Sequence, residues 1–151
     1  MFRGISSLNL DTKGRLAIPT RYREQLVDVC ASELVITADM DHCLLIYPKP
    51  TWLEIEKKLV AMPTFDAAAR NMQRLYIGSA AELDMDGQGR ILLPPALRKF
   101  AGLDKKVALV GQMNKFELWD EETWKSKQED WLKSVVLTDL NLPPEFKSLS
   151  I

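Results

Sequence analysis

Two stretches of this sequence decide the fold: "LNLDTKGRLAIPTRYR" at 8–23 and "LDMDGQGRILLPPALR" at 83–98. They align without gaps at an offset of 75 residues. The identical pairs are Leu8/Leu83, Asp11/Asp86, Gly14/Gly89, Arg15/Arg90, Pro19/Pro94 and Arg23/Arg98. Similarity resumes downstream, where "CLLIYPKPTW" (43–52) aligns with "KFELWDEETW" (115–124). The pattern indicates a tandem duplication of a unit of about 45 residues.

Each copy predicts the same order of elements, β-β-α-β-β, and therefore an α+β fold. The first two strands of a copy are joined by a tight turn, "DTKG" or "DGQG", in which Asp bonds neighbouring backbone and Gly supplies a positive φ. We expect this turn to be a hairpin tip. The strands are predicted at 6–10, 15–19, 34–38 and 43–47, and again at 80–85, 90–94, 106–111 and 115–119. Pro19 and Pro94 open short helices at 20–29 and 95–101, and Gly102 is expected to cap the second.

The remaining segments predict helices outside the repeat. These helices are expected at 50–61, 64–76 and 121–136, the first two separated by Pro63. The predicted organisation is a first half at 5–52, a helical linker at 53–80, a second half at 81–124, and a C-terminal helix and tail at 125–151. Trp52 and Trp124 recur in both copies, which favours a place in each core, whereas Trp131 is left open between core and interface.

Composition points to a globular chain of 151 residues, with 46% hydrophobic and 27% charged residues. No apolar run approaches the roughly 20 residues that span a bilayer, and the N-terminus lacks the apolar core of a signal peptide. The two cysteines have neither CxxC spacing nor a histidine cluster, so no zinc site or disulfide framework is indicated. These features favour the cytoplasm.

The net charge of −1 conceals an uneven distribution. Residues 1–25 and residues 86–106 each carry a net charge of +3, and the rest of the chain is acidic. Concentrated basic segments attract phosphate backbones. The alternative is ordinary solvated surface charge.

The segment "DMDGQGR" (84–90) resembles the start of an EF-hand, but the rest of that pattern is missing. Position five is Gln88 and position twelve is Pro95, where a bidentate glutamate is required. The first copy places Lys13, a cation, at the position of Gln88. The shared Asp-x-x-Gly-Arg pattern is better explained by a turn and an arginine than by a metal, and no cofactor is indicated.

These residues carry a resemblance to a known family. "FRG…LNLDTKGRLAIPTRYR", "ELDMDGQGRILLPPALRKFAGL" and "LVGQMNKFELWD" resemble MraZ, a family of transcriptional regulators encoded at the head of bacterial division and cell-wall gene clusters. The resemblance covers residues 2–124. It implies a double SpoVT/AbrB-like swapped-hairpin fold, ring-like homo-oligomers, and binding to short direct repeats in the family's own promoter. The motif residues that carry over are Asp11, Lys13, Arg15, Asp86, Gln88 and Arg90.

The chemistry of these residue types supports DNA binding. Arginine offers a planar fork for guanine O6/N7 or phosphate, and a carboxylate four residues earlier can hold the fork in one rotamer. We therefore expect Arg15 and Arg90 to contact double-stranded DNA, with Asp11 and Asp86 orienting them. Phosphate contacts are expected from Lys13 and, more weakly, Arg3, Arg21 and Arg23. A single unit would bind weakly, so several units in a ring are expected to raise avidity. The alternative is that the Asp–Arg pairs only stabilise the turns.

Two other classes of function compete with the DNA-binding hypothesis. An enzyme is disfavoured because His42 is the only histidine, its "DHC" context is absent from the second copy, and no nucleotide or protease motif occurs. No small-molecule substrate is indicated. A structural or protein-interaction ring module without DNA binding remains the alternative, and its binding would lack the steep salt dependence of phosphate contacts.

Overall fold

The computed structural model describes residues 1–137 and 142–150. The chain separates into two compact units, Met1–Glu121 and Glu122–Ile151. The first unit contains both copies of the repeat, and the second contains most of the C-terminal helix.

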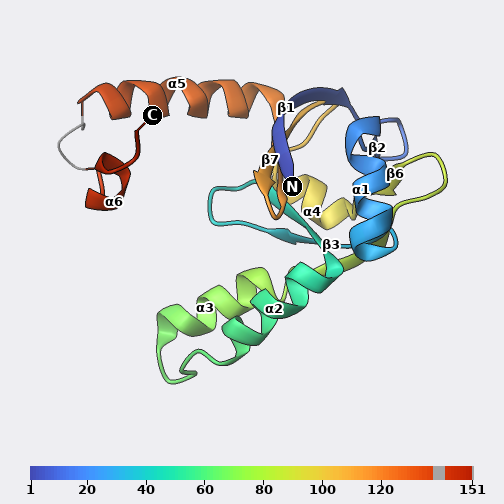
Figure 1. The fold of residues 1–151 in the computed structure, drawn as a ribbon. Coiled ribbons are helices and arrows are strands. Elements are labelled where there is room, and N and C mark those ends of the chain that lie inside the picture. Colours follow the sequence, from blue (N-terminus) through green and yellow to red (C-terminus); the bar gives the residue numbers. More distant parts are fainter. Residues whose placement is uncertain (138–141, 151) are drawn as a thin grey trace. The chain divides into compact units, whose positions relative to one another are not determined.

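The first unit is built on an antiparallel sheet of six strands in the order β1-β7-β8-β4-β3-β5 and a separate two-stranded ribbon, β2-β6. The strands of the first copy are β1 (Phe2–Asn9), β2 (Arg15–Ala17), β3 (Glu33–Ala38) and β4 (Leu44–Pro48). Those of the second copy are β5 (Ala81–Asp84), β6 (Arg90–Leu92), β7 (Lys106–Met113) and β8 (Phe116–Asp120). Figure 1 shows β2 and β6 side by side at the right of the view.

The two halves exchange their strands. β1 pairs with β7, from Phe2↔Met113 to Asn9↔Lys106, and β5 pairs with β3. Each half thus contributes its first strand to the other half's part of the sheet, and β4 joins β8 at the centre. When every strand is replaced by its counterpart in the other copy, the same strand order results, read from the opposite edge of the sheet. The sheet is therefore symmetric with respect to the two halves. The predicted fold, two tandem swapped-hairpin halves, is confirmed.

Both faces of the central strands are buried, and each face has its own helices. Leu34 and Ile36 of β3 belong to the main core with Leu26 of α1 (Thr20–Cys30) and Leu97 of α4 (Pro95–Phe100). Thr37, which points to the other face because side chains alternate along a strand, donates from Oγ1 to the carbonyl oxygen at the end of α3 at 2.6 Å. This second face packs against α2 (Lys49–Val60) and α3 (Ala67–Tyr76), which lie side by side in Figure 1.

Several element bounds differ from the prediction. β1 begins at Phe2 rather than at residue 6, because it pairs along the whole length of a strand that lies a hundred residues away. α3 begins at Ala67 rather than at 64, since Oδ1 of Asp66 accepts the N–H of Ala68 and caps the helix there. Gly102 has φ 61° and follows α4, as expected for a helix cap. In α2, Trp52 is buried, whereas the apolar side chains of Leu53 and Val60 are exposed.

The C-terminal helix α5 spans Glu121–Leu137, as predicted to within one residue. Trp124 is buried, and its ring lies edge-on to Trp131 at a centroid distance of 5.3 Å. A short helix, α6 (Pro144–Lys147), falls in the segment predicted as the tail after the C-terminal helix. Residues 138–141 and 151 of that tail lie outside the described residues. Among the described residues, no helix is both long and apolar enough to cross a membrane.

Candidate nucleic-acid interface

The first tip of the repeat is a closed turn organised by Asp11. Its carbonyl oxygen accepts the N–H of Gly14 at 3.0 Å, and its own N–H donates to the carbonyl of Arg15 at 3.0 Å. Oδ1 accepts the backbone N–H groups of Lys13 at 2.9 Å and Arg15 at 2.8 Å, and Oδ2 accepts Nε of Arg15 at 2.6 Å. Gly14 makes the turn possible with φ 81°. One carboxylate therefore holds both the backbone of the tip and the arginine that follows it.

The second tip repeats this geometry bond for bond. Oδ1 of Asp86 accepts the backbone N–H groups of Gln88 and Arg90, each at 2.9 Å, and Oδ2 accepts Nε of Arg90 at 3.1 Å. Gly89 has φ 75°. Because the two oxygens of Asp86 are engaged by these three donors, the resemblance of this segment to a calcium loop is accounted for by a turn.

The hydrogen bonds also affect how the two aspartates titrate. The backbone N–H of Arg15 lowers the pKa of Asp11, and the guanidinium of Arg15 adds to the effect. The backbone N–H of Arg90 lowers the pKa of Asp86 in the same way. Both carboxyl groups therefore stay ionised beside their arginines at neutral pH.

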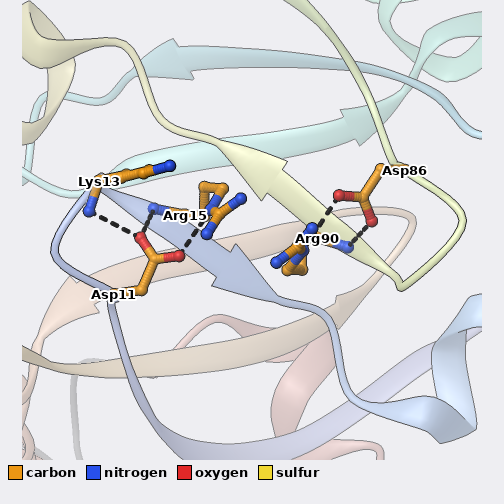
Figure 2. Close-up of polar contacts among 5 residues, drawn as sticks. All are labelled: Asp11, Lys13, Arg15, Asp86 and Arg90. Atoms are coloured by element: carbon orange, nitrogen blue, oxygen red, sulfur yellow. Dashed lines mark hydrogen bonds and ion pairs between the residues drawn. The ribbon is translucent and has the colours of Figure 1, made fainter.

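The β2–β6 ribbon brings the two arginines to one face. Arg15 pairs with Leu92 and Arg90 pairs with Ala17, while Leu16 and Ile91 form the pair between them. Leu16 and Ile91 are buried in the core, so the alternation of a strand turns Arg15 and Arg90 outward together. Figure 2 shows the two arginines close together over the ribbon, one from each strand, with Asp11 and Asp86 on the outer sides.

This arrangement leaves hydrogen-bond donors available for an external acceptor. The side chains of Arg15 and Arg90 are 31% and 32% exposed. Among the described residues, each makes its side-chain contact through Nε alone, so the terminal guanidinium nitrogens keep their N–H groups. Lys13 and Gln88 are exposed on the two turns beside them. Two adjacent guanidinium groups, each ion-paired at Nε and with its terminal N–H groups free of partners among the described residues, form a site suited to an acceptor-rich ligand.

The other predicted contact residues, Arg3, Arg21 and Arg23, have partners of their own within the first unit. Arg21 donates to Ser6 Oγ at 2.6 Å and lies 4.6 Å from the centre of the Tyr22 ring, so it is tied to β1. Arg3 is exposed on β1, and its carbonyl oxygen accepts the hydroxyl of Tyr22. Arg23 is partly buried and donates from Nε to the carbonyl of Ile18 at 2.7 Å. The structure therefore groups Asp11, Lys13, Arg15, Asp86, Gln88 and Arg90 at the ribbon.

One residue beside this site was missed by the sequence interpretation. Arg98 of α4 lies against Gly14 of the first tip, and it lines a surface hollow together with Leu10, Asp11 and Thr12. The sequence repeat could have pointed to Arg98, because arginine occupies the same position in both copies, as Arg23 and Arg98.

The residues considered for catalysis or metal binding are dispersed. His42 is exposed in the β3–β4 turn and stacks on Phe100 at a centroid distance of 5.2 Å. Both cysteines are buried, and burial raises the pKa of each thiol. Among the residues that the structure describes, no three His, Cys, Asp or Glu side chains converge as metal ligands.

Comparison with known proteins places this chain in a family. A family model described as "MraZ protein, putative antitoxin-like" matches residues 1–75 and 76–135, so that each match contains one tip. The chain belongs to the MraZ family. It is 56% identical over 150 residues to the transcriptional regulator MraZ of Thioalkalivibrio sulfidiphilus, covering 94% of this chain and all of that protein. It is 52% identical over 152 residues to the transcriptional regulator MraZ of Halorhodospira halophila, over the full length of both chains. The MraZ of Pseudomonas aeruginosa is 49% identical over 150 residues, which is 99% of each chain.

Proposed function

We propose that this MraZ-family protein is a transcriptional regulator that binds double-stranded DNA through the outer face of the β2–β6 ribbon. The observation that carries the proposal is the pair of adjacent arginines, Arg15 and Arg90, each held at Nε by an aspartate of its own turn. The relatives of similar length are named transcriptional regulators, which supports the same role here.

The ribbon suits the major groove of DNA. A two-stranded antiparallel ribbon fits that groove, where arginine makes bidentate contacts to guanine O6 and N7. Each such contact contributes roughly 1–3 kcal/mol of discrimination against the wrong base. Because Asp11 and Asp86 already fix their arginines, less side-chain entropy is lost when the contacts form.

Residues around the arginines extend the proposed interface. Lys13 and Gln88 sit on the exposed turns on either side, where they reach phosphate or the edge of the groove. Arg3 and Arg21 on the neighbouring β1 and α1 supply further positive charge for the phosphate backbone. The β2–β6 ribbon joins the two sequence segments that each carry a net charge of +3.

We further propose that the target is a set of short direct repeats in the promoter of the protein's own gene cluster, bound by a ring-like homo-oligomer at the nucleoid. One ribbon offers two arginines, so several copies meeting several repeats raise the effective concentration. Exposed apolar side chains on and between α2 and α3, namely Leu53, Val60 and Phe65, supply surface for contacts between subunits.

A salt titration distinguishes this proposal from a protein-interaction module. Fluorescence anisotropy with duplexes that carry the upstream direct repeats, and with scrambled duplexes, is measured between about 50 and 200 mM salt. We expect preference for the repeats and an affinity that falls steeply with salt, because bound phosphates release counterions. Equal binding of both duplexes would refute the sequence-specific part of the proposal. Binding of neither duplex would refute DNA binding and favour the protein-interaction module.

A further inference from the structure

Two arginines outside the proposed DNA contact occupy equivalent places beneath the two tips. Arg23 on α1 and Arg98 on α4 are counterparts in the repeat. Each packs against the glycine of the opposite half. A Cβ atom added to Gly14 would lie 2.6 Å from Cζ of Arg98, and one added to Gly89 would lie 2.1 Å from Nε of Arg23. At these distances a Cβ atom would clash with the arginine and push it aside. Only glycine therefore permits the contact.

The backbone connects the same partners. The N–H of Leu93 donates to the carbonyl of Gly14 at 3.1 Å, and the N–H of Ile18 donates to the carbonyl of Gly89 at 2.8 Å. Leu93 directly follows β6 on the way to α4, and Ile18 directly follows β2 on the way to α1. Each half therefore contacts the other half's tip twice. The first contact is the backbone hydrogen bond, and the second is the packing of the arginine five residues later in the sequence against the tip glycine.

We infer that Arg98 is a positioning residue for the first tip and Arg23 a positioning residue for the second, so that each half orients the DNA-contacting arginine of the other. The inference rests on the proposed DNA-binding function of Arg15 and Arg90. Gly14 lies directly before Arg15, and Gly89 directly before Arg90. A guanidinium packed against that glycine fixes the turn that presents the contact residue.

This assignment changes the expected role of Arg23. The sequence suggested a phosphate contact, but its Nε is committed to the carbonyl of Ile18 at 2.7 Å and its stem lies against Gly89. The two sites also differ. Among the described residues, the buried Nε of Arg98 has no hydrogen-bond partner, so Arg98 is held by packing, whereas Arg23 is held by packing and a hydrogen bond. Loss of Arg23 should therefore loosen its tip more than loss of Arg98.

Hydrogen–deuterium exchange tests the crosswise arrangement without DNA. Arg98→Ala should speed exchange of the backbone amides at 13–15 several-fold while those at 88–90 stay unchanged, and Arg23→Ala should show the reverse. Arg98→Lys keeps the charge and most of the stem, and it should restore part of the protection if Arg98→Ala destabilises the fold. The inference would be overturned if exchange became faster at the tip of the half that carries the substitution, or equally at both tips.

A double-mutant cycle tests the functional consequence in the full-length protein. Affinity for the direct-repeat duplex is measured by anisotropy for Arg98→Ala alone, with Arg15→Ala and with Arg90→Ala. We expect Arg98→Ala to weaken binding about tenfold in the otherwise unchanged protein and beside Arg90→Ala, and to have little further effect beside Arg15→Ala. Equal effects in both backgrounds would show a general structural role. If the unchanged protein binds no duplex, the proposed function fails, while the exchange experiment still decides the crosswise contact.

Discussion

Replacing the glycines of the two tips tests the packing beneath them. Gly14, Gly89 and Gly102 all have positive φ, of 81°, 75° and 61°. Alanine at any of them is strained by about 1 kcal/mol or somewhat more. A Cβ at Gly102 meets nothing within 4 Å, so Gly102→Ala reports this backbone strain alone.

The tip glycines carry an additional cost that the structure ranks. Gly89→Ala must displace Arg23, which then loses its hydrogen bond to the carbonyl of Ile18. A hydrogen bond from a charged donor contributes about 1.5–3 kcal/mol, so Gly89→Ala should cost roughly 3 kcal/mol in total. Gly14→Ala displaces Arg98, whose Nε has no hydrogen-bond partner to lose in the part of the chain that the structure describes. Its cost should fall between the other two.

Urea unfolding at one fixed protein concentration provides the measurement, because oligomer contacts make stability depend on concentration. The expected order of destabilisation is Gly89→Ala, then Gly14→Ala, then Gly102→Ala. If Gly89→Ala costs no more than Gly102→Ala, Arg23 does not pack against the second tip as described. If Gly14→Ala is the most costly, the different bonding of Arg98 and Arg23 does not determine their contributions.

Three further predictions concern titration, a buried hydroxyl and the thiols. Because the pKa values of Asp11 and Asp86 lie below their ordinary value of 3.8 in the folded protein, their stabilising effect is complete above pH 3.8 and is lost as the pH falls through the lowered values. The difference in unfolding free energy between the unchanged protein and Asp11→Asn/Asp86→Asn should therefore shrink below pH 3.8, and a constant difference in acid would refute this. Thr37→Val leaves the carbonyl at the end of α3 without its donor and should cost about 1–3 kcal/mol in urea unfolding, whereas an unchanged midpoint would show that the hydroxyl is dispensable. Burial raises the pKa of Cys30 and of Cys43, so both should resist a thiol reagent at pH 8 until urea is added; rapid labelling of the folded protein would contradict their burial.

The tips were predictable from sequence because their geometry is local. An Asp at the first turn position and a Gly at the fourth favour a turn through local contacts alone, and the arginine follows directly. Helix starts at Pro19 and Pro94 were predictable for the same reason. Repetition of the pattern identified both tips as parts of one recurring unit.

The partners of the strands were not predictable from local pattern. Two copies with nearly the same apolar alternation satisfy pairing within a half and pairing between halves equally well, and only the family resemblance implied the exchange. β1 began four residues earlier than predicted because its extra length is specified by β7, not by its own sequence. Arg98 was overlooked because its contact with Gly14 lies between halves, and helix periodicity reveals nothing about it.

The most direct test of the central claim removes both outward arginines and leaves the fold in place. Anisotropy with the direct-repeat duplex should compare the unchanged protein with Arg15→Ala/Arg90→Ala and with Lys57→Ala/Lys58→Ala, which removes the same charge from an exposed face of α2. Circular dichroism confirms that each variant is folded. Loss of two arginine contacts of at least about 1 kcal/mol each should weaken binding by about 30-fold or more, while the lysine variant should bind almost normally. Unchanged affinity in a folded Arg15→Ala/Arg90→Ala variant would contradict the account and move the DNA contact away from the ribbon.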